Sequence, residues 1–386
     1  MARRNITTGI DIGTSHVRVV VAEYKDGGMP EIIGTGSIES RGLRHGYIVN
    51  MPEATESIHR AVKKAEKNAG VAIKKAFVAI GGLSLESSLE TAAVFISRAD
   101  NEVTETDIAN VVDASEEHVG SSANKQIIHA IPTQFRLDGE PVLGKPTGMK
   151  GSRLEVTTLF VTCLTQHLND FVQAVEEAGV QVEDIMASPI AASFVTLNKR
   201  QKTAGCVLAN IGAETLSIAV FENNIPISLK IFPIGGEEIT NDIALGFKIP
   251  LDEAENIKTG EQISSYPKKK LEDIIQARLS DIFDLIDAHL KKIRKNGLLP
   301  AGIIITGGSS AIPFIEDFAK SSLRLPSKVA APELTKNAGP VVDSRWSVAY
   351  GLCIMGVDAE SEEGAGMKLA RKTKNGTLAW LKQFLP

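Results

Sequence analysis

Two short glycine turns, one in each half of the chain, carry groups suited to holding phosphate. The first lies in Asp11–Val21 and the second in Asn210–Val220. In both, Asp or Asn is followed two residues later by glycine and then by an alternating, β-branched-rich run, which is typical of a β-hairpin. Backbone amides and hydroxyls at such a tip can form a concave anion site. The pair predicts a clamp for a phosphate chain between two similar domains.

Either hairpin alone would be explained equally well by an ordinary α/β domain or by a phosphate site. A third glycine motif favours the phosphate site. Ile303–Thr306 reads as a buried strand that leads into Gly307 and Gly308, and we expect a helix over 312–318. Glycines lack a Cβ and let a ligand approach the backbone closely. The order of the three motifs resembles the actin-like ATPase superfamily, and Ala187–Ser193 and Arg345–Leu352 resemble its two connecting helices. The expected fold is α/β and actin-like, with two related domains.

Composition argues against several other classes of function. The chain has 386 residues, 43% hydrophobic and 23% charged, which is ordinary for a globular protein of two or more domains. Its net charge of −5 gives no reason to expect nucleic-acid binding. The cysteines and histidines lack the spacing of a disulfide framework or zinc site. We find no signal peptide and no apolar run of ~18 residues, so we expect a cytoplasmic protein.

Each half has an additional segment between its strands. In the first half, a helix is predicted over 51–68, ending at Gly70. It is followed by an insertion at about 84–164, in which Thr104–Asp107 reads as a capping box that opens a helix. In the second half, a mainly helical segment over 236–298 includes a long amphipathic helix at 271–294.

The last residues have the pattern of a helix that lies on a membrane. On a helical projection five apolar side chains share an arc of roughly 160°: Leu378, Trp380, Leu381, Phe384 and Leu385. Basic residues lie upstream, and an apolar face with a basic rim is typical of interfacial anchors on anionic bilayers. A helix docked on its own domain, or disordered residues, is the alternative. The acidic, glycine-containing stretch at 358–366 favours the membrane anchor.

Together with several local motifs, these features resemble the FtsA family of bacterial divisome proteins. The motifs are His45–Asn50, Val103–Ile108, Pro146–Glu155 and Ala254–Lys258, the last being similar to the family's nucleotide-facing helix. The resemblance covers nearly the whole chain. It implies an ATP-binding protein that polymerises and tethers filaments of the tubulin-like protein FtsZ to the cytoplasmic side of the cell membrane at the division site.

The resemblance also implies a subdomain organisation and partners. Subdomain 1C (84–164) should make a head-to-tail contact between subunits. Subdomain 2B (236–298) should receive the C-terminal peptide of FtsZ, with Lys291, Lys292 and Arg294 as candidate contacts. The terminal helix should bind anionic lipid, and other divisome proteins are further expected partners. The remaining divisions are 1A (1–83 and 165–202), 2A (203–235 and 299–357), a flexible linker (358–375) and the membrane-targeting helix (376–386).

The candidate cofactor is Mg²⁺-ATP, held between the two halves. Asp11 would act on the metal through water, while Gly307 and Gly308 would lie against the adenosine with Glu255 and Lys258 on its other side. The full set of candidate contacts is Asp11, Gly13, Thr14, Ser15, Gly212, Ala213, Thr215, Gly235, Gly236, Glu255, Lys258, Gly307, Gly308 and Ser309.

One departure from the superfamily pattern affects the expected chemistry. The second hairpin usually opens with Asp followed by glycines, whereas here it has Asn210, Ala213 and Glu214. Asn supplies no negative charge to help hold hydrated Mg²⁺ and the attacking water. Glu214 would repel phosphate unless it points away or meets metal. We therefore expect ATP binding with weak or no hydrolysis, and assign no catalytic residue.

Two other interpretations share this fold. A sugar or acetate kinase of the same superfamily would need a carboxylate base beside its cleft. The sequence has no recognisable arrangement of that kind, and a basic amphipathic tail has no use in a soluble kinase. The actin-like pilus-assembly protein PilM has a similar core but no obligatory anchoring helix.

Overall fold

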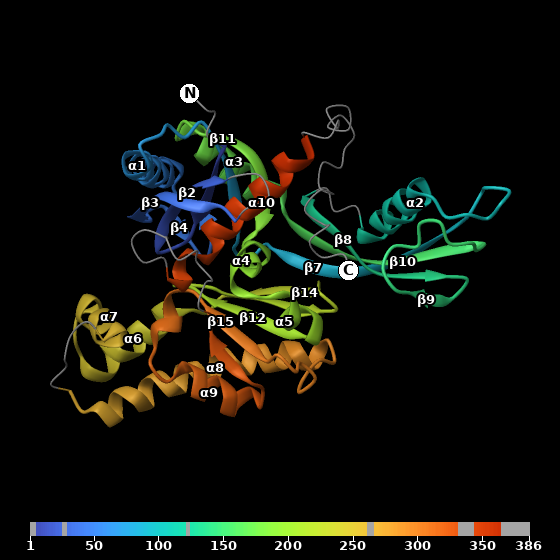
Figure 1. Ribbon diagram of the computed structural model, residues 1–386. Coiled ribbons are helices and arrows are strands. Elements are labelled where there is room, and N and C mark those ends of the chain that lie inside the picture. The colour runs from blue at the N-terminus through green and yellow to red at the C-terminus, as the bar shows by residue number, and fades with distance from the viewer. Residues whose placement is uncertain (1–4, 25–28, 121–123, 261–265, 331–342, 364–386) are drawn as a thin grey trace.

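Two five-stranded sheets with the same topology form the cores of the two halves of the chain (Figure 1). The computed structural model describes residues 5–24, 29–120, 124–260, 266–330 and 343–363, with side chains up to residue 357. In each sheet, three antiparallel strands are followed by two parallel ones. The first sheet runs β3 (Glu31–Glu39), β2 (His16–Tyr24), β1 (Asn5–Ile12), β6 (Lys75–Ile80), β11 (Gln181–Ala187); the second runs β14 (Ile225–Phe232), β13 (Leu216–Glu222), β12 (Cys206–Ile211), β15 (Ile303–Thr306), β16 (Ser327–Val329).

Helix α1 (Met51–Ala69) covers the first sheet and closely follows the predicted range. Asn50 caps its first turn, and Gly70 ends it with a left-handed φ of 67°. Its buried face packs on β2 and β3, so closely that a Cβ at Gly36 would overlap the backbone of α1. Nearby elements of the first half are β4 (Leu43–Arg44), β5 (Tyr47–Ile48) and α3 (Thr165–Glu177).

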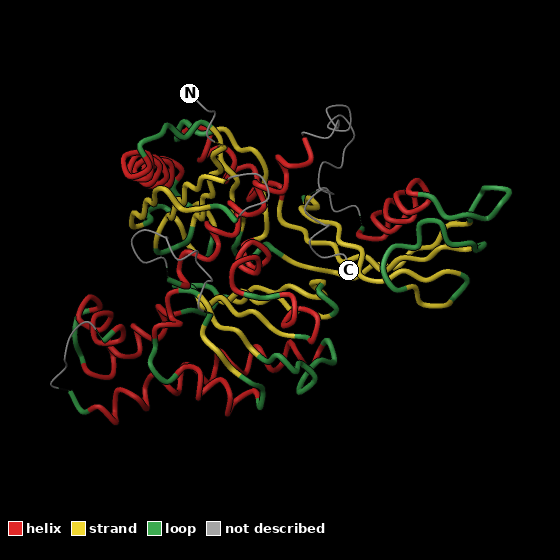
Figure 2. Tube along the Cα trace, in the orientation of Figure 1, coloured by secondary structure: helices red, strands yellow, loops and turns green. Residues whose placement is uncertain are grey.

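A four-stranded sheet is inserted after β6 and projects to one side of the molecule (Figures 1 and 2). Helix α2 lies against this sheet and begins at the predicted capping box of Thr104 and Asp107. The insertion also touches the second half, because the Ser87 hydroxyl donates to the Leu229 carbonyl (2.8 Å) and accepts from the Leu229 amide (2.9 Å). Its elements are β7 (Glu86–Phe95), α2 (Glu105–Glu116), a 3₁₀ turn (Glu117–Val119), β8 (Lys125–Leu137), β9 (Glu140–Val142) and β10 (Arg153–Leu164).

Helices of the second half pack against its sheet, and two of them differ from the predicted ranges. The long helix ends at Lys292 and not at Arg294, because Arg294 adopts a left-handed φ of 58°. The helix after the Gly-Gly motif begins at Ile315 and not at Ile312, because Pro313 disfavours a helical conformation in the residue before it. The helices are α5 (Lys199–Ala204), α6 (Gly236–Phe247), α7 (Leu251–Thr259), α8 (Lys268–Lys292) and α9 (Ile315–Leu323).

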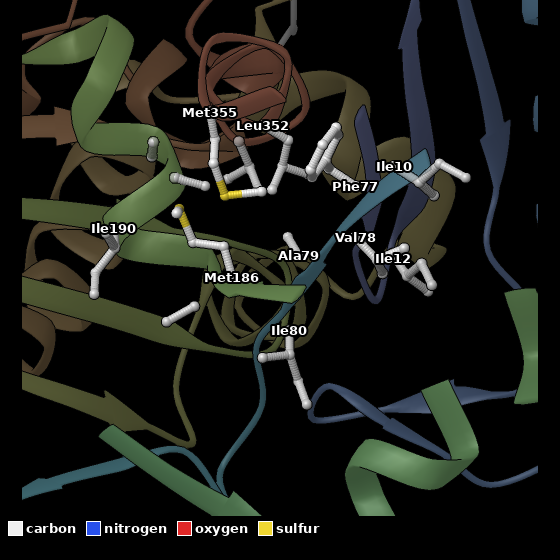
Figure 3. Packing of buried hydrophobic residues seen from close by; sticks show 14 of the residues in the cluster. Ile10, Ile12, Phe77, Val78, Ala79, Ile80, Met186, Ile190, Leu352 and Met355 are labelled. Atoms are coloured by element: carbon white, nitrogen blue, oxygen red, sulfur yellow. The ribbon is translucent and has the colours of Figure 1, made fainter. Parts of the chain in front are cut away.

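Two helices, α4 (Ser188–Thr196) and α10 (Ser347–Glu363), cross between the sheets. Helix α10 packs on β1 and β2, whereas α4 contacts β12 and β13. The crossing is tight, since a Cβ at Gly351 would lie 1.9 Å from the carbonyl oxygen of Ala191. Figure 3 shows Leu352 and Met355 of α10 among buried residues of the first sheet and α4. These helices therefore connect the two halves through a common core.

Candidate functional site

The two predicted glycine turns have the same backbone geometry. The amide of Gly13 donates to the carbonyl of His16 (3.2 Å), and the amide of Gly212 donates to the carbonyl of Thr215 (2.9 Å). A Cβ on either glycine would press against that same carbonyl, at 3.0 and 3.1 Å. The repeated sequence pattern therefore corresponds to a repeated turn, each at the tip of a hairpin beside a parallel strand.

Asp11 and Arg18 face each other across the first hairpin, where they are register partners in β1 and β2. Burial raises the pKa of Asp11 to about 6, and the neighbouring Arg18 guanidinium opposes that shift. The turn itself is braced by Ser40, whose hydroxyl donates to the carbonyl of Gly13 (2.6 Å) and whose amide donates to that of Ser15 (2.9 Å). The first turn is thus a fixed loop beside the desolvated carboxyl group of Asp11. Thr14, at the tip of this turn, is half-buried.

The Gly235-Gly236 segment lies directly on the second turn. The amide of Gly236 donates to the carbonyl of Gly212 (2.8 Å), and that of Glu237 donates to the carbonyl of Ala213 (2.8 Å). A Cβ at Gly235 would overlap Ala213, and one at Gly236 would overlap the hydroxyl of Ser309. At Gly235 the obstacle is the backbone of Ala213 and Gly212, which cannot move aside, so glycine is required there.

Lys258 is a buried cation next to this junction. Its ammonium donates to the carbonyl of Gly236 (3.0 Å), the hydroxyl of Thr240 (2.8 Å) and the carboxylate of Glu255 (2.6 Å). Only 8% of the Lys258 side chain is exposed, compared with 49% for Glu255. The network ties α7 to the start of α6 and places one positive charge close to the second glycine turn.

The Gly-Gly motif completes the site in the second half. Gly307 has a φ of 92°, and a Cβ there would overlap the Asn210 side chain and the Ile211 carbonyl. A Cβ at Gly308 would meet nothing within 4 Å, so that stretch of backbone is open to a ligand. Asn210, Gly307 and Ser309 therefore lie around the same point at the ends of β12 and β15.

The segment just before α10 joins this group to the first turn. Thr306 donates from its hydroxyl to the carbonyl of Ser344 (2.8 Å), and the hydroxyls of Ser310 and Ser344 are 2.8 Å apart. The adjacent Arg345 and Asp343 act electrostatically on Arg18 in the first hairpin. The Gly-Gly motif and the first hairpin thus lie on either side of residues 343–345.

A second, direct contact joins the halves at the tip of the second hairpin. The main-chain amide of His45 donates to the Glu214 carboxylate, and the His45 Nδ1 lies 3.3 Å from the Glu214 carbonyl oxygen. The Glu214 side chain therefore points toward the β4–β5 hairpin. Burial raises the pKa of Glu237, and the adjacent Glu214, which shares a hydrogen bond with it, raises it further.

The sequence predicted most of the residues that meet here but did not predict a role for Arg18, Ser40, His45 or Ser344. Arg18 and His45 lie within motifs that the sequence singles out, and neither motif indicates the partner of the residue. Thr215 lies half-buried beside Glu214 at the second turn.

The comparisons with known proteins identify the family. A model of the SHS2 domain inserted in FtsA matches residues 82–162, and a model of cell division protein FtsA matches residues 207–351. The chain is 31% identical to cell division protein FtsA of Pseudomonas aeruginosa over 377 residues, covering 92% of this chain and 90% of the relative. This chain belongs to the FtsA family. The FtsA of Bacillus subtilis is also 31% identical, covering 91% of this chain and 83% of the relative, and that of Escherichia coli K12 is 26% identical.

Solved structures of other proteins confirm the actin-like fold of this FtsA-family chain. A PilM–PilN type IV pilus biogenesis complex aligns with a TM-score of 0.68 at 18% identity, covering 91% of this chain and 98% of that chain. MreB5 of Spiroplasma citri bound to ADP aligns with a TM-score of 0.53 at 14% identity. This alignment covers 94% of this chain and 99% of that chain. These likenesses concern the fold. The pilus-assembly alternative shares that fold, whereas family membership makes the chain a cell division protein.

Two further observations concern metals and membranes. Among the described residues, no group of three or more His, Cys, Asp or Glu side chains is arranged to hold a metal ion. In the same part of the chain, no helix is both long and apolar enough to span a bilayer. The predicted anchor at 376–386, with Leu378, Trp380, Leu381, Phe384 and Leu385, lies outside the described residues.

Proposed function

We propose that this FtsA-family protein binds Mg²⁺-ATP between its two halves, forms filaments, and tethers FtsZ filaments to the cytoplasmic face of the membrane at the division site. The repeated glycine turn, present once on each side of the junction, is the observation that carries the nucleotide part. Two solved structures support it. They are MreB5 of Spiroplasma citri bound to ADP and bound to AMPPNP, and they align with this chain with TM-scores of 0.53 and 0.52.

The residues at the site fit this cofactor. Gly235 and Gly236 pack the start of α6 closely on the second turn, and Gly308 leaves backbone open to contact. Asp11 is a desolvated carboxyl group whose ionised form a divalent cation would stabilise. When bound, Mg²⁺-ATP would supply a phosphate chain and metal charge for these groups to bind. Gly13, Thr14, Ser15 and Thr215 would hold the phosphates, and Lys258 with Glu255 would flank the adenosine.

We further propose that hydrolysis is weak or absent. Asn210 stands where the superfamily usually has Asp, and its side chain is held against Gly307. An amide oxygen can accept a hydrogen bond from water, but it cannot supply the charge that holds hydrated Mg²⁺ and polarises the nucleophile. The protein would therefore use ATP mainly as a structural ligand.

Filament formation is assigned to the insertion at 84–164, as part of the subdomain division given above. Its surface carries exposed apolar side chains, with Phe95 79% and Leu143 100% exposed. Its two outer strands, β7 and β9, are the edges of its sheet. An exposed edge with large apolar side chains is suited to contact with another subunit.

The FtsZ peptide is assigned to the segment at 236–298, and the membrane contact to the terminal helix. Leu245 and Leu251 stay 78% and 56% exposed on that segment. Of the basic candidates at the end of α8, Lys291 is paired with Asp287, so Lys292 and Arg294 are the better candidates for an acidic partner.

The decisive experiment is electron microscopy of the protein with ATP on anionic lipid, with and without residues 368–386. The proposal expects membrane-bound filaments for the full chain and loss of membrane binding for the truncated chain. Deletion of 84–164 should abolish filaments while ATP binding, measured by calorimetry, persists. If the full chain shows no heat of ATP binding at millimolar ligand, the nucleotide part of the proposal is wrong.

A further inference from the structure

Glu214 makes a direct contact between the two halves of the proposed nucleotide site. It belongs to the second glycine turn, and its carboxylate accepts the main-chain amide of His45 from the β4–β5 hairpin of the first half. The imidazole Nδ1 of His45 is also 3.3 Å from the Glu214 carbonyl oxygen and 4.0 Å from a carboxylate oxygen. Only 16% of the Glu214 side chain is exposed. The contact therefore lies in a largely dry position at the tip of the phosphate-binding turn.

The β4–β5 hairpin is held rigidly from behind. Gly46 packs against Gly82 so closely that a Cβ on either would overlap the other. The carbonyl of Gly46 also contacts the Nε2 of His167 (2.9 Å), and the Nδ1 of that histidine is bonded to Ser84. His45 is thus presented by a fixed turn, with a left-handed φ of 48° that aims its amide at the second half.

The Glu214 side of the contact is equally fixed. The turn that carries it is bonded to the start of α6 through the amides of Gly236 and Glu237. Glu237 lies beside Glu214 and shares a hydrogen bond with it, so the Glu214 carboxyl has a second partner on α6. Because both sides are anchored to their own domains, the His45–Glu214 contact must break if the two halves separate.

We propose that Glu214 is a positioning residue that holds the two halves closed through the amide of His45 and thereby slows the release of bound nucleotide. This inference rests on the nucleotide site proposed above. It gives a role to a carboxylate that would otherwise repel phosphate. Bound nucleotide lies between the halves, so its release requires them to move apart and the contact to open first.

The strength of the contact sets the expected effect. Hydrogen bonds to charged groups contribute more than neutral ones, and their loss corresponds to roughly a tenfold or larger change in an equilibrium or rate. A Glu214→Ala variant should therefore release nucleotide about tenfold faster or more. Glu214→Gln keeps an acceptor at the same position and should restore most of the slow release.

The test is stopped-flow release of a fluorescent ATP analogue, in the presence of Mg²⁺, from the full chain and its variants. Glu222→Gln serves as the matched control, because it removes an acidic group at the far end of β13 from the turn, where the carboxylate pairs with Lys295 and does not touch the His45 amide. It should release nucleotide no faster than the native chain. If phosphate repulsion were the main effect of Glu214, both Glu214 variants would release nucleotide more slowly than the native chain. That result, or a Glu214→Gln variant as fast as Glu214→Ala, would overturn the proposal.

A measurement without nucleotide separates this inference from the proposed function. Hydrogen exchange of the His45 amide should speed up in Glu214→Ala and stay slow in Glu222→Gln, with the melting temperature little changed. If the native chain does not bind the analogue, the proposed nucleotide site fails. If the native chain binds it and Glu214→Ala shows native release and native exchange, only the positioning role fails.

Discussion

The crossing of α4 and α10 allows a quantitative test with two matched glycines. Gly351 in α10 and Gly246 in α6 are both helical, so Gly→Ala should add up to about 1 kcal/mol of helix stability at either position. Their surroundings differ. A Cβ at Gly351 would lie 1.9 Å from the backbone oxygen of Ala191, whereas one at Gly246 would meet the terminal methyl of Ile274 at 2.5 Å. The methyl can rotate away, but the carbonyl moves only with its helix.

A carbon–oxygen contact normally needs roughly 3.3–3.6 Å, so Gly351→Ala must push α10 and α4 apart by more than about 1 Å. Overpacking of this kind costs typically about 1–3 kcal/mol, and a backbone contact belongs at the upper end. After the helix gain, Gly351→Ala should lose about 2 kcal/mol of unfolding free energy, while Gly246→Ala should be neutral or slightly stabilised.

Thermal unfolding followed by circular dichroism measures this difference. At about 2–4 °C per kcal/mol, the two variants should melt several degrees apart. ATP affinity, measured by calorimetry, should also fall in Gly351→Ala, because the displaced helices connect the two halves of the proposed site. Equal melting temperatures for the two variants, or a higher one for Gly351→Ala, would refute the view that the crossing is closely packed.

Three further predictions concern other parts of the chain. Lys258→Met keeps the buried stem but loses three hydrogen bonds, so ATP affinity in calorimetry should fall about tenfold or more. Burial lowers the pKa of His129 from its ordinary value of 6.5 to about 3. As the pH falls below 6.5, the unfolded chain therefore binds a proton on His129 that the folded chain does not bind. Between pH 7 and pH 5 the native chain should therefore lose about 2 kcal/mol more stability in urea unfolding than His129→Gln, whose amide can still accept from Ala187. Trp380→Glu should abolish co-sedimentation with anionic liposomes and leave ATP binding intact; unchanged co-sedimentation would mean that the tail is not the anchor.

Features determined by local sequence were predicted well. The two glycine turns, the cap at Thr104 and the end of α1 at Gly70 each depend on residues a few positions apart. The actin-like fold followed from the order of such local motifs. The error after Gly308 was also local, since Pro313 already indicated that a helix could not continue through Ile312.

Contacts between distant segments could not be predicted in the same way. His45 and Glu214 are separated by 169 positions, and their contact depends on a main-chain amide that every residue except proline has. The Ser87–Leu229 contact likewise joins two edge strands whose side chains carry no complementary pattern. Such pairs are set by how whole domains pack, and a single sequence does not show that.

The position of α10 has a consequence for synthesis on the ribosome. This helix lies near the end of the chain but covers strands at its beginning: Cys353 contacts the carbonyl of Val20 (3.5 Å), and the Tyr350 hydroxyl donates to that of Pro30 (2.8 Å), 320 positions away. At about 5–20 residues per second, the first sheet emerges tens of seconds before the helix that completes it. During that time the apolar residues Val20 and Ala22, both fully buried in the finished fold, are without their covering helix. The nascent first half therefore exposes this apolar surface until α10 docks, and a chain truncated before Ser347 should aggregate more readily than the full chain.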